Sequence, residues 1–175
     1  MGARQPYSAA KHPNTHEYVQ RRMLAVVGRV PYCNLVGPAP VHFKVIVTST
    51  TGVFFDGVSK FIVSTLRQAG FQAIHLDPFE TSEIIVNTAH LENADAIGVS
   101  SRSGEHLKVF LEILDQMAAR DMKQVLLFGF GTIPPTDADE LIQRGVGRLF
   151  GPGTNPPDIV KYLAEELPRR RVPPK

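Results

Sequence analysis

Residues 42–48 read His-Phe-Lys-Val-Ile-Val-Thr, a short apolar run rich in β-branched side chains. Such a run is typical of a strand that is buried on both faces. A loop follows, and from Asp56 to Ala69 apolar residues recur at the spacing of one helical face before Gly70 ends the helix. The expected stripe consists of Val58, Phe61, Ile62, Thr65, Leu66 and Ala69. The stretch therefore predicts one strand followed by one helix.

The same unit recurs along the rest of the chain. Further strands are expected at residues 71–76, 94–100, 124–130 and 146–150. Helices are expected at about 82–91 with Thr81 as N-cap, at 104–120, at 136–145 with Thr136 as cap, and at 157–167. Strands that are apolar throughout, alternating with helices, predict an α/β fold: a doubly wound, flavodoxin-like or Rossmann-like, five-stranded parallel sheet with helices on both faces.

The two ends of the chain differ in composition from its middle. Residues 1–41 are rich in proline and carry five basic side chains against one acidic side chain, and residues 168–175 carry four basic side chains and no acid. We therefore expect a basic N-terminal arm (1–41), an α/β domain (42–167) and a basic C-terminal tail (168–175). We expect both arms to contact protein subunits of a larger assembly, or RNA. The residues expected to do so are Arg4, Lys11, Arg21, Arg22, Arg29, Arg169, Arg170 and Arg171.

Several classes of protein are disfavoured by what the sequence lacks. No apolar run reaches about 18 residues, so no transmembrane segment is expected. The single cysteine, Cys33, forms no thiolate cluster for a metal, and His75, His90 and His106 have no metal-ligand spacing. His106 is expected to be a partly exposed residue at a helix start. The Arg-rich, acid-poor N-terminal segment is compatible with organellar targeting and predicts a mitochondrial, or otherwise a cytoplasmic, location.

Ligands of doubly wound folds bind beyond the carboxyl ends of the strands, so function is read from the loops there. Four motifs near these ends are specific in combination: residues 96–101 (AIGVSS), Gly104-x-His106, residues 131–135 (GTIPP) and residues 150–154 (FGPGT). With them, the span from about Lys44 to Leu167 resembles the cobalamin-binding domain of methylmalonyl-CoA mutase and related mutases. The resemblance implies the fold described above and a site for cobalamin.

The positions that would hold the cofactor differ from the family's pattern. In the family an Asp-x-His-x-x-Gly motif precedes the first helix, and its histidine replaces the cofactor's own base on cobalt. Here Val53, Phe55 and Val58 stand at the three motif positions. A phenyl ring has no lone pair for cobalt, so ligation by this loop is not expected.

Two further contact loops have changed as well. The family's Ser-x-Leu matches Ser100-Ser101-Arg102, and its Gly-Gly, which lets the cofactor's nucleotide tail pass, matches Phe130-Gly131. Phe130 is expected to project into that slot unless its side chain turns into the core. We therefore expect a vestigial pocket at Val53, Phe55, Val58, Ser100, Arg102, Phe130 and Gly131, with no cofactor, no metal and no catalytic residue.

Three functions follow from these observations, and the first is favoured. It is a non-catalytic structural or interaction subunit of a larger assembly, such as a mitochondrial ribosome or another organellar complex. The alternative is a cobalamin-binding small subunit or accessory protein of a mutase, in which the cofactor's own base stays on cobalt. The second alternative is an FMN-binding protein, because Ser49-x-Thr51-Gly52 is similar to the hydroxyl-rich phosphate loop of flavodoxins.

Overall fold

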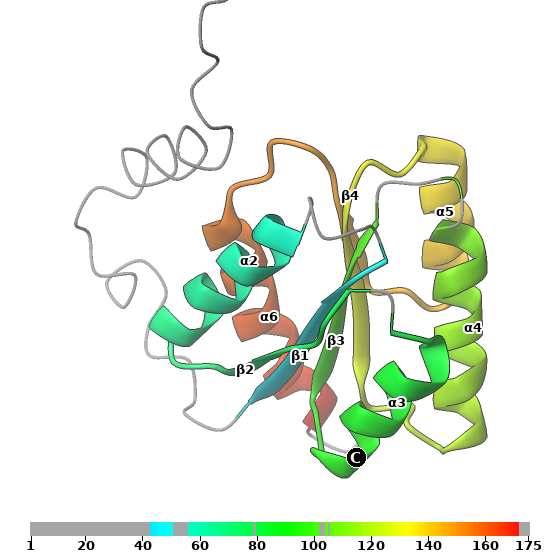
Figure 1. The fold of residues 1–175 in the computed structure, drawn as a ribbon, viewed down its shortest axis with the longest axis horizontal. Helices are drawn as coiled ribbons and strands as arrows, with labels where there is room; N and C mark the ends of the chain where they lie inside the picture. Colours follow the sequence, from blue (N-terminus) through cyan, green and yellow to red (C-terminus); the bar gives the residue numbers. More distant parts are fainter. Residues whose placement is uncertain (1–42, 51–55, 79, 102–103, 105, 172–175) are drawn as a thin grey trace, which may run out of the picture.

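The computed structural model describes residues 43–50, 56–78, 80–101, 104 and 106–171. The expectations for the N-terminal arm, the FMN loop, Val53, Phe55 and Arg102 lie outside these residues. Within them, strands and helices alternate (Figure 1), in the order β1 (Lys44–Ser49), α2 (Asp56–Gln68), β2 (Gln72–His75), α3 (Ser82–Leu91), β3 (Ala96–Ser101), α4 (His106–Ala119), β4 (Leu126–Gly131), α5 (Pro135–Arg144), β5 (Arg148–Phe150) and α6 (Pro156–Arg171).

The five strands form one parallel sheet in the order β2-β1-β3-β4-β5. The predicted fold class is therefore confirmed. The chain runs outward from β1 to β2, returns to β3 on the other side of β1, and then continues in the opposite direction. This reversal between β1 and β3 is the place where doubly wound sheets bind ligands, at the carboxyl ends of the strands.

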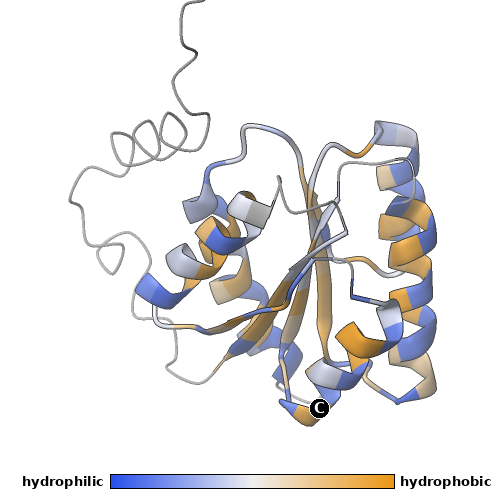
Figure 2. Ribbon diagram, viewed as in Figure 1, coloured by the Kyte–Doolittle hydropathy of each residue, from blue (hydrophilic) through white to orange (hydrophobic). Residues whose placement is uncertain are grey.

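Helices cover both faces of the sheet (Figure 1). The buried residues of α2 and α6 pack on one face, and those of α3, α4 and α5 pack on the other. Apolar residues gather on the strands and on the helix sides turned toward them, while the outer helix surfaces are hydrophilic (Figure 2). Burial of this apolar area is the main stabilising contribution to the fold. Among the described residues, no helix combines the length and the apolar character needed to cross a bilayer.

Two of the predicted helix signals are confirmed and one is wrong. Thr81 is the N-cap of α3, and its hydroxyl accepts a hydrogen bond from the Ile84 amide at 3.3 Å. Gly145 ends α5 in the left-handed conformation, with φ 116°. Thr136, predicted as a cap, lies inside α5. The N-cap residue is Pro134, which makes no side-chain hydrogen bond. Proline has a fixed φ suited to the first turn, which sets the helix start without a capping hydroxyl.

The expected apolar stripe of the first helix includes one residue that the structure exposes. Val58 is 42% exposed, so its placement in the stripe is wrong. Instead Ser59, Ile62 and Val63 are buried, and the Ser59 hydroxyl lies 3.5 Å from the Thr48 carbonyl oxygen, to which it donates. A small hydroxyl side chain therefore faces the sheet at the start of α2, where the pattern had placed a valine.

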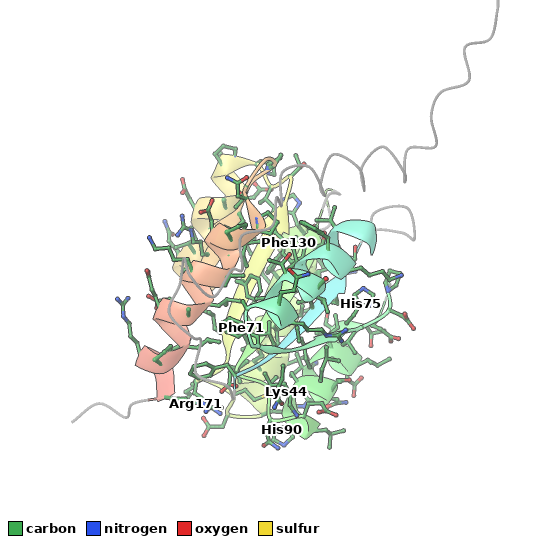
Figure 3. The ribbon with its side chains drawn as sticks, turned by 90° about the vertical axis from the view of Figure 1, so that its left-hand side faces the viewer. Lys44, Phe71, His75, His90, Phe130 and Arg171 are labelled. Carbon is green, nitrogen blue, oxygen red and sulfur yellow. The ribbon has the colours of Figure 1, made fainter. Side chains whose placement is uncertain are left out.

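The end of α6 is fastened to the amino ends of β1 and β3. Arg171 forms an ion pair with Asp95 at 2.8 Å, and its guanidinium lies 4.5 Å from the centre of the Phe43 ring. Asp95 also accepts a hydrogen bond from the Lys44 amide at 2.7 Å. This cluster places Arg171 and Lys44 at the end of the sheet away from Phe130 (Figure 3).

Side-chain size alternates along β4 in a way that fixes both layers. Phe128 and Phe130 point into the layer under α2 and α6, whereas Gly129 faces the other layer. The Phe128 ring lies on Gly98 of β3, so that a Cβ built on Gly98 would overlap the ring. A glycine is therefore required beneath Phe128.

Adding one methyl group at Gly98 tests this packing. We expect Gly98→Ala to lower the free energy of unfolding by about 1–3 kcal/mol, because a filled core responds to extra volume with strain. Urea denaturation followed by circular dichroism measures the change. Gly57, exposed in the first turn of α2 with open space around it, is the control. Gly57→Ala should raise stability by about 0.5 kcal/mol. Equal stability of the Gly98 variant and the wild type would contradict this account of the layer.

Candidate functional site

Hydroxyl side chains line the carboxyl ends of the two central strands. Thr48 and Ser49 end β1, and Ser100 and Ser101 end β3; all four are at most 7% exposed. Ser49 and Ser100 are paired in the parallel register, which brings the two strand ends side by side. The residues form a hydroxyl row at the topological switch point, where a bound ligand would meet them.

Hydrogen bonds hold this end of the sheet to the chain around it. The Thr48 hydroxyl donates to the Asp77 carbonyl oxygen at 3.4 Å. Thr50 donates twice to the Ser100 carbonyl oxygen, from its amide at 3.0 Å and from its hydroxyl at 3.2 Å. These bonds connect the loop after β1 to the end of β3, so the edge is a fixed surface.

Ser101 differs from its neighbours in the row. Its side chain is 1% exposed, and its Oγ has no hydrogen-bond partner in the described part of the chain. A buried hydroxyl without a partner costs about 1–3 kcal/mol. Such a group in a native fold calls for an explanation, and a polar ligand at the strand ends would supply the missing partner.

Gly131 lies opposite Ser101 at the end of β4, and no side chain covers the backbone at this position. Its φ is +131°, and a Cβ at this position would overlap the Ser101 carbonyl oxygen. The next amide, that of Thr132, donates to the same carbonyl oxygen at 3.1 Å. No other residue type fits here without moving the strands apart, so the edge between β3 and β4 presents bare backbone to a ligand.

Phe130 has turned into the core. It is 3% exposed and packs in the layer between the sheet and the helices α2 and α6 (Figure 3). Its ring centre lies 6.4 Å from that of Phe128. The side chain therefore occupies the inside of the layer close to the strand ends, beneath the hydroxyl row.

A partly buried hydrogen-bonded pair joins the loops that follow β3 and β4. His106, the first residue of α4, lies 2.6 Å from Asp137 in the first turn of α5, measured from Nε2 to Oδ2. His106 is 4% exposed, so the expectation of a partly exposed histidine is wrong. Asp137 Oδ1 also accepts a hydrogen bond from the Thr136 hydroxyl at 3.0 Å. The pair holds the two helix starts together beside the hydroxyl row.

The structure brings together some of the residues that the sequence singled out. Ser100, Phe130 and Gly131 meet at one edge of the sheet, whereas Arg171 lies at the opposite edge. The binding role of the basic arms stays a prediction. Ser101 and Asp137 were missed, because neither burial of a hydroxyl nor a contact across 31 positions is visible in a local pattern. No group of three or more His, Cys, Asp or Glu side chains is placed for a metal in the described ranges.

Together, the fold and the edge define a doubly wound domain with a ligand edge of hydroxyls and backbone. The family model of the B12 binding domain matches residues 43–161. The chain therefore belongs to the B12 binding domain family.

Similar proteins include separate small subunits of mutases. The chain is 30% identical over 120 residues to the pivalyl-CoA mutase small subunit of Xanthobacter autotrophicus, covering 69% of this chain and 80% of that one. It is 33% identical over 104 residues to the 2-hydroxyisobutanoyl-CoA mutase small subunit of Aquincola tertiaricarbonis, covering 59% and 76%. It is 28% identical to methylmalonyl-CoA mutase of Rhizobium meliloti but spans only 16% of that chain.

Solved structures agree on the fold. A cobalamin-binding protein from Desulfitobacterium hafniense has a TM-score of 0.61 at 18% identity, covering 71% of this chain and 58% of that one. A response-regulator receiver domain from Francisella has a TM-score of 0.60 at 11% identity, covering 74% and 100%. At these identities the likeness establishes the parallel α/β architecture alone.

These findings correct two expectations. The favoured function, a structural subunit of a ribosomal or similar assembly, is wrong, because the family match and the small-subunit relatives support the cobalamin-binding alternative. The expectation of no cofactor is wrong for the same reason, since the family points to cobalamin. The expectation rested on the changed residues of three contact loops, Phe55 and Phe130 among them, whereas a ligand as large as cobalamin is held by many contacts.

The described residues fit one part of cobalamin and not another. The unpartnered Ser101 hydroxyl and the bare backbone at Gly131 suit the polar, amide-rich rim of a corrin placed over the strand ends. The layer beneath does not suit the nucleotide tail, because buried phenyl rings fill it.

The His106–Asp137 pair predicts a difference in acid stability. The hydrogen bond from His106, followed by that from Thr136, lowers the pKa of Asp137 below its ordinary value of 3.8. A carboxyl with a lowered folded-state pKa stabilises the fold while it is ionised, and this contribution disappears as the pH falls below 3.8 through the lowered value. Urea midpoints measured across that range should therefore fall more steeply for the wild type than for Asp137→Asn. Asp139→Asn, an exposed change on the same helix, should follow the wild type. Identical slopes for all three proteins would contradict a role of the pair.

Proposed function

We propose that this chain is the cobalamin-binding subunit of an acyl-CoA mutase, acting with a separate catalytic partner. The observation that carries the proposal is the family match over residues 43–161, which spans the whole sheet and the hydroxyl row. The likeness to two mutase small subunits supports the assignment of cofactor binding and catalysis to separate subunits. Within the described residues no group of three or more His, Cys, Asp or Glu side chains is placed for a metal. The chemistry is assigned to the cofactor and the partner.

The hydroxyl row supplies the contacts that this function requires. Ser101 offers a free donor, Ser100 lies beside it, and Gly131 permits close approach of the ligand to backbone. Cobalamin, when bound, supplies radical chemistry that amino-acid side chains do not provide. The residues of this chain bind the cofactor and orient it toward the partner. The His106–Asp137 pair keeps the two flanking loops at a fixed separation while they do so.

Removing the Ser101 hydroxyl tests the proposed edge. The wild-type chain should bind hydroxocobalamin and co-elute with its visible absorbance in gel filtration. We expect Ser101→Ala to weaken binding by about tenfold, the equivalent of one lost hydrogen bond of about 1.4 kcal/mol. The same variant without ligand should be more stable by about 1 kcal/mol, because an unpaired buried hydroxyl has been removed.

Thr65→Val is the matched control for this variant. The Thr65 hydroxyl is also buried, but it donates to the Phe61 carbonyl oxygen within α2, at 3.0 Å. Its removal should leave the affinity for hydroxocobalamin unchanged. A wild-type chain that binds no corrinoid by equilibrium dialysis would end the proposal, and unchanged affinity of Ser101→Ala would remove the hydroxyl row from it.

A further inference from the structure

We infer that this chain holds cobalamin with the nucleotide tail outside the layer between the sheet and helices α2 and α6, so that the cofactor's own base stays on cobalt. The inference rests on the proposed function and concerns the form in which the cofactor is bound. It follows from the space beneath the hydroxyl row, which belongs to the described part of the chain.

The register identifies which side chains border that space. On the three inner strands, the positions that face α2 and α6 nearest the carboxyl edge are Ser49 on β1, Ser100 on β3 and Phe130 on β4, in one row that Phe150 continues on β5. On the same three strands, the next row inward is formed by Val47, Gly98 and Phe128. Any ligand group that passes from the edge into the layer must cross these two rows.

Phenyl rings close both rows on the β4 side. Phe130 is 3% exposed and Phe128 is 0% exposed, and both belong to the core shared by α2 and α6. The Phe128 ring extends sideways over Gly98, the one position in the second row without a side chain of its own. The space that a glycine would leave open on β3 is thus filled from β4.

Neighbouring side chains hold the rings in place. Phe128 packs edge-on against Phe150, with ring centres 6.4 Å apart, and Phe150 packs edge-on against Tyr162 of α6 at 5.6 Å. The Arg148 guanidinium covers both Phe150 and Tyr162, at 5.0 and 5.6 Å from the ring centres. Displacing Phe130 for a nucleotide tail would expose its ring to water and disturb this connected stack, which makes entry of the tail unfavourable.

Cobalt chemistry points the same way. Displacing the cofactor's base breaks a coordination bond to cobalt. That bond is replaced only when the protein supplies another ligand. Phe55, at the position that the family resemblance assigns to the ligating histidine, has no lone pair. With no replacement ligand at that position and no room for the freed base, the complex retains the bond between cobalt and the base.

Electron paramagnetic resonance of the cobalt(II) form distinguishes the candidate ligands. We would load the uniformly ¹⁵N-labelled full chain with unlabelled cob(II)alamin. A ¹⁴N base on cobalt gives triplet superhyperfine lines, a ¹⁵N histidine of the protein gives doublets, and a displaced base without replacement gives neither. We expect triplets.

Comparison with cobinamide, a corrinoid that lacks the nucleotide tail, gives an independent readout. A tail that stays outside the protein contributes no contacts, so the wild-type dissociation constants for aquocobalamin and cobinamide should agree within about threefold. Phe130→Ala combined with Phe55→His opens the first row and supplies an imidazole for cobalt, and should shift the ratio by about tenfold in favour of cobalamin, with doublets replacing the triplets. Phe130→Leu, which keeps the core apolar, serves if the alanine variant does not fold. Phe110→Leu is the matched control, because this buried ring packs on the other face of the sheet.

The outcomes separate the inference from the proposed function. Triplets and equal affinities in the wild type support the inference. Doublets, absence of nitrogen coupling, or cobalamin binding more than about tenfold tighter than cobinamide would overturn it and leave the proposed function intact. If neither corrinoid binds the full chain, the proposed function fails, and the inference fails with it.

Discussion

The alternation of large and missing side chains along β4 determines the geometry of both layers. Phe128 and Phe130 fill the space under α2 and α6, and Gly129 leaves room for the Phe110 ring of α4 on the other face. A Cβ at Gly129 would overlap that ring. Because side chains of a strand alternate strictly between faces, a shift of one residue would place rings where the sheet has no room and leave a void where rings now pack. One strand thus fixes the separation of the sheet from its helices on both sides.

The same strand connects the core to the ligand edge. Phe130 ends the buried stack, and Gly131, one residue later, is bare backbone beside the unpartnered Ser101 hydroxyl. The edge therefore changes from apolar to polar within a single residue. In the proposed function, ligand contacts come from the strand ends and the loops after them, and the His106–Asp137 pair links two of those loops.

Much of this architecture could be predicted from the sequence, because it depends on local patterns. Buried strands are short apolar runs, and Thr81 and Gly145 mark helix ends through hydrogen bonds within one turn. Thr136 was misassigned since two signals competed, and the fixed φ of proline outweighed the hydroxyl. The burial of His106 depends on an acid 31 residues away, which no local pattern reveals.

The functional prediction failed for a different physical reason. The phenyl ring of Phe55 has no lone pair for cobalt. A ligand of this size is held by many contacts, and the loss of one does not remove the rest. Phe130 was read as filling the slot unless it turned into the core. Its side chain lies in the core, in the layer under α2 and α6. Sequence alone locates the changed positions, whereas the connectivity of the space between them requires coordinates.

The contact between Arg171 and Phe43 has a consequence for how this domain can be attached to other proteins. The last residue of α6 and the residue before β1 meet at the amino ends of the strands, and Asp95 binds to both Arg171 and the Lys44 amide there. A covalent tether at either position would leave from the side of the sheet opposite the hydroxyl row. A circular permutant that joins these two positions would need only a short linker. Evolution and protein engineering alike can therefore fuse the domain to a neighbour while the cofactor-facing surface stays free to dock.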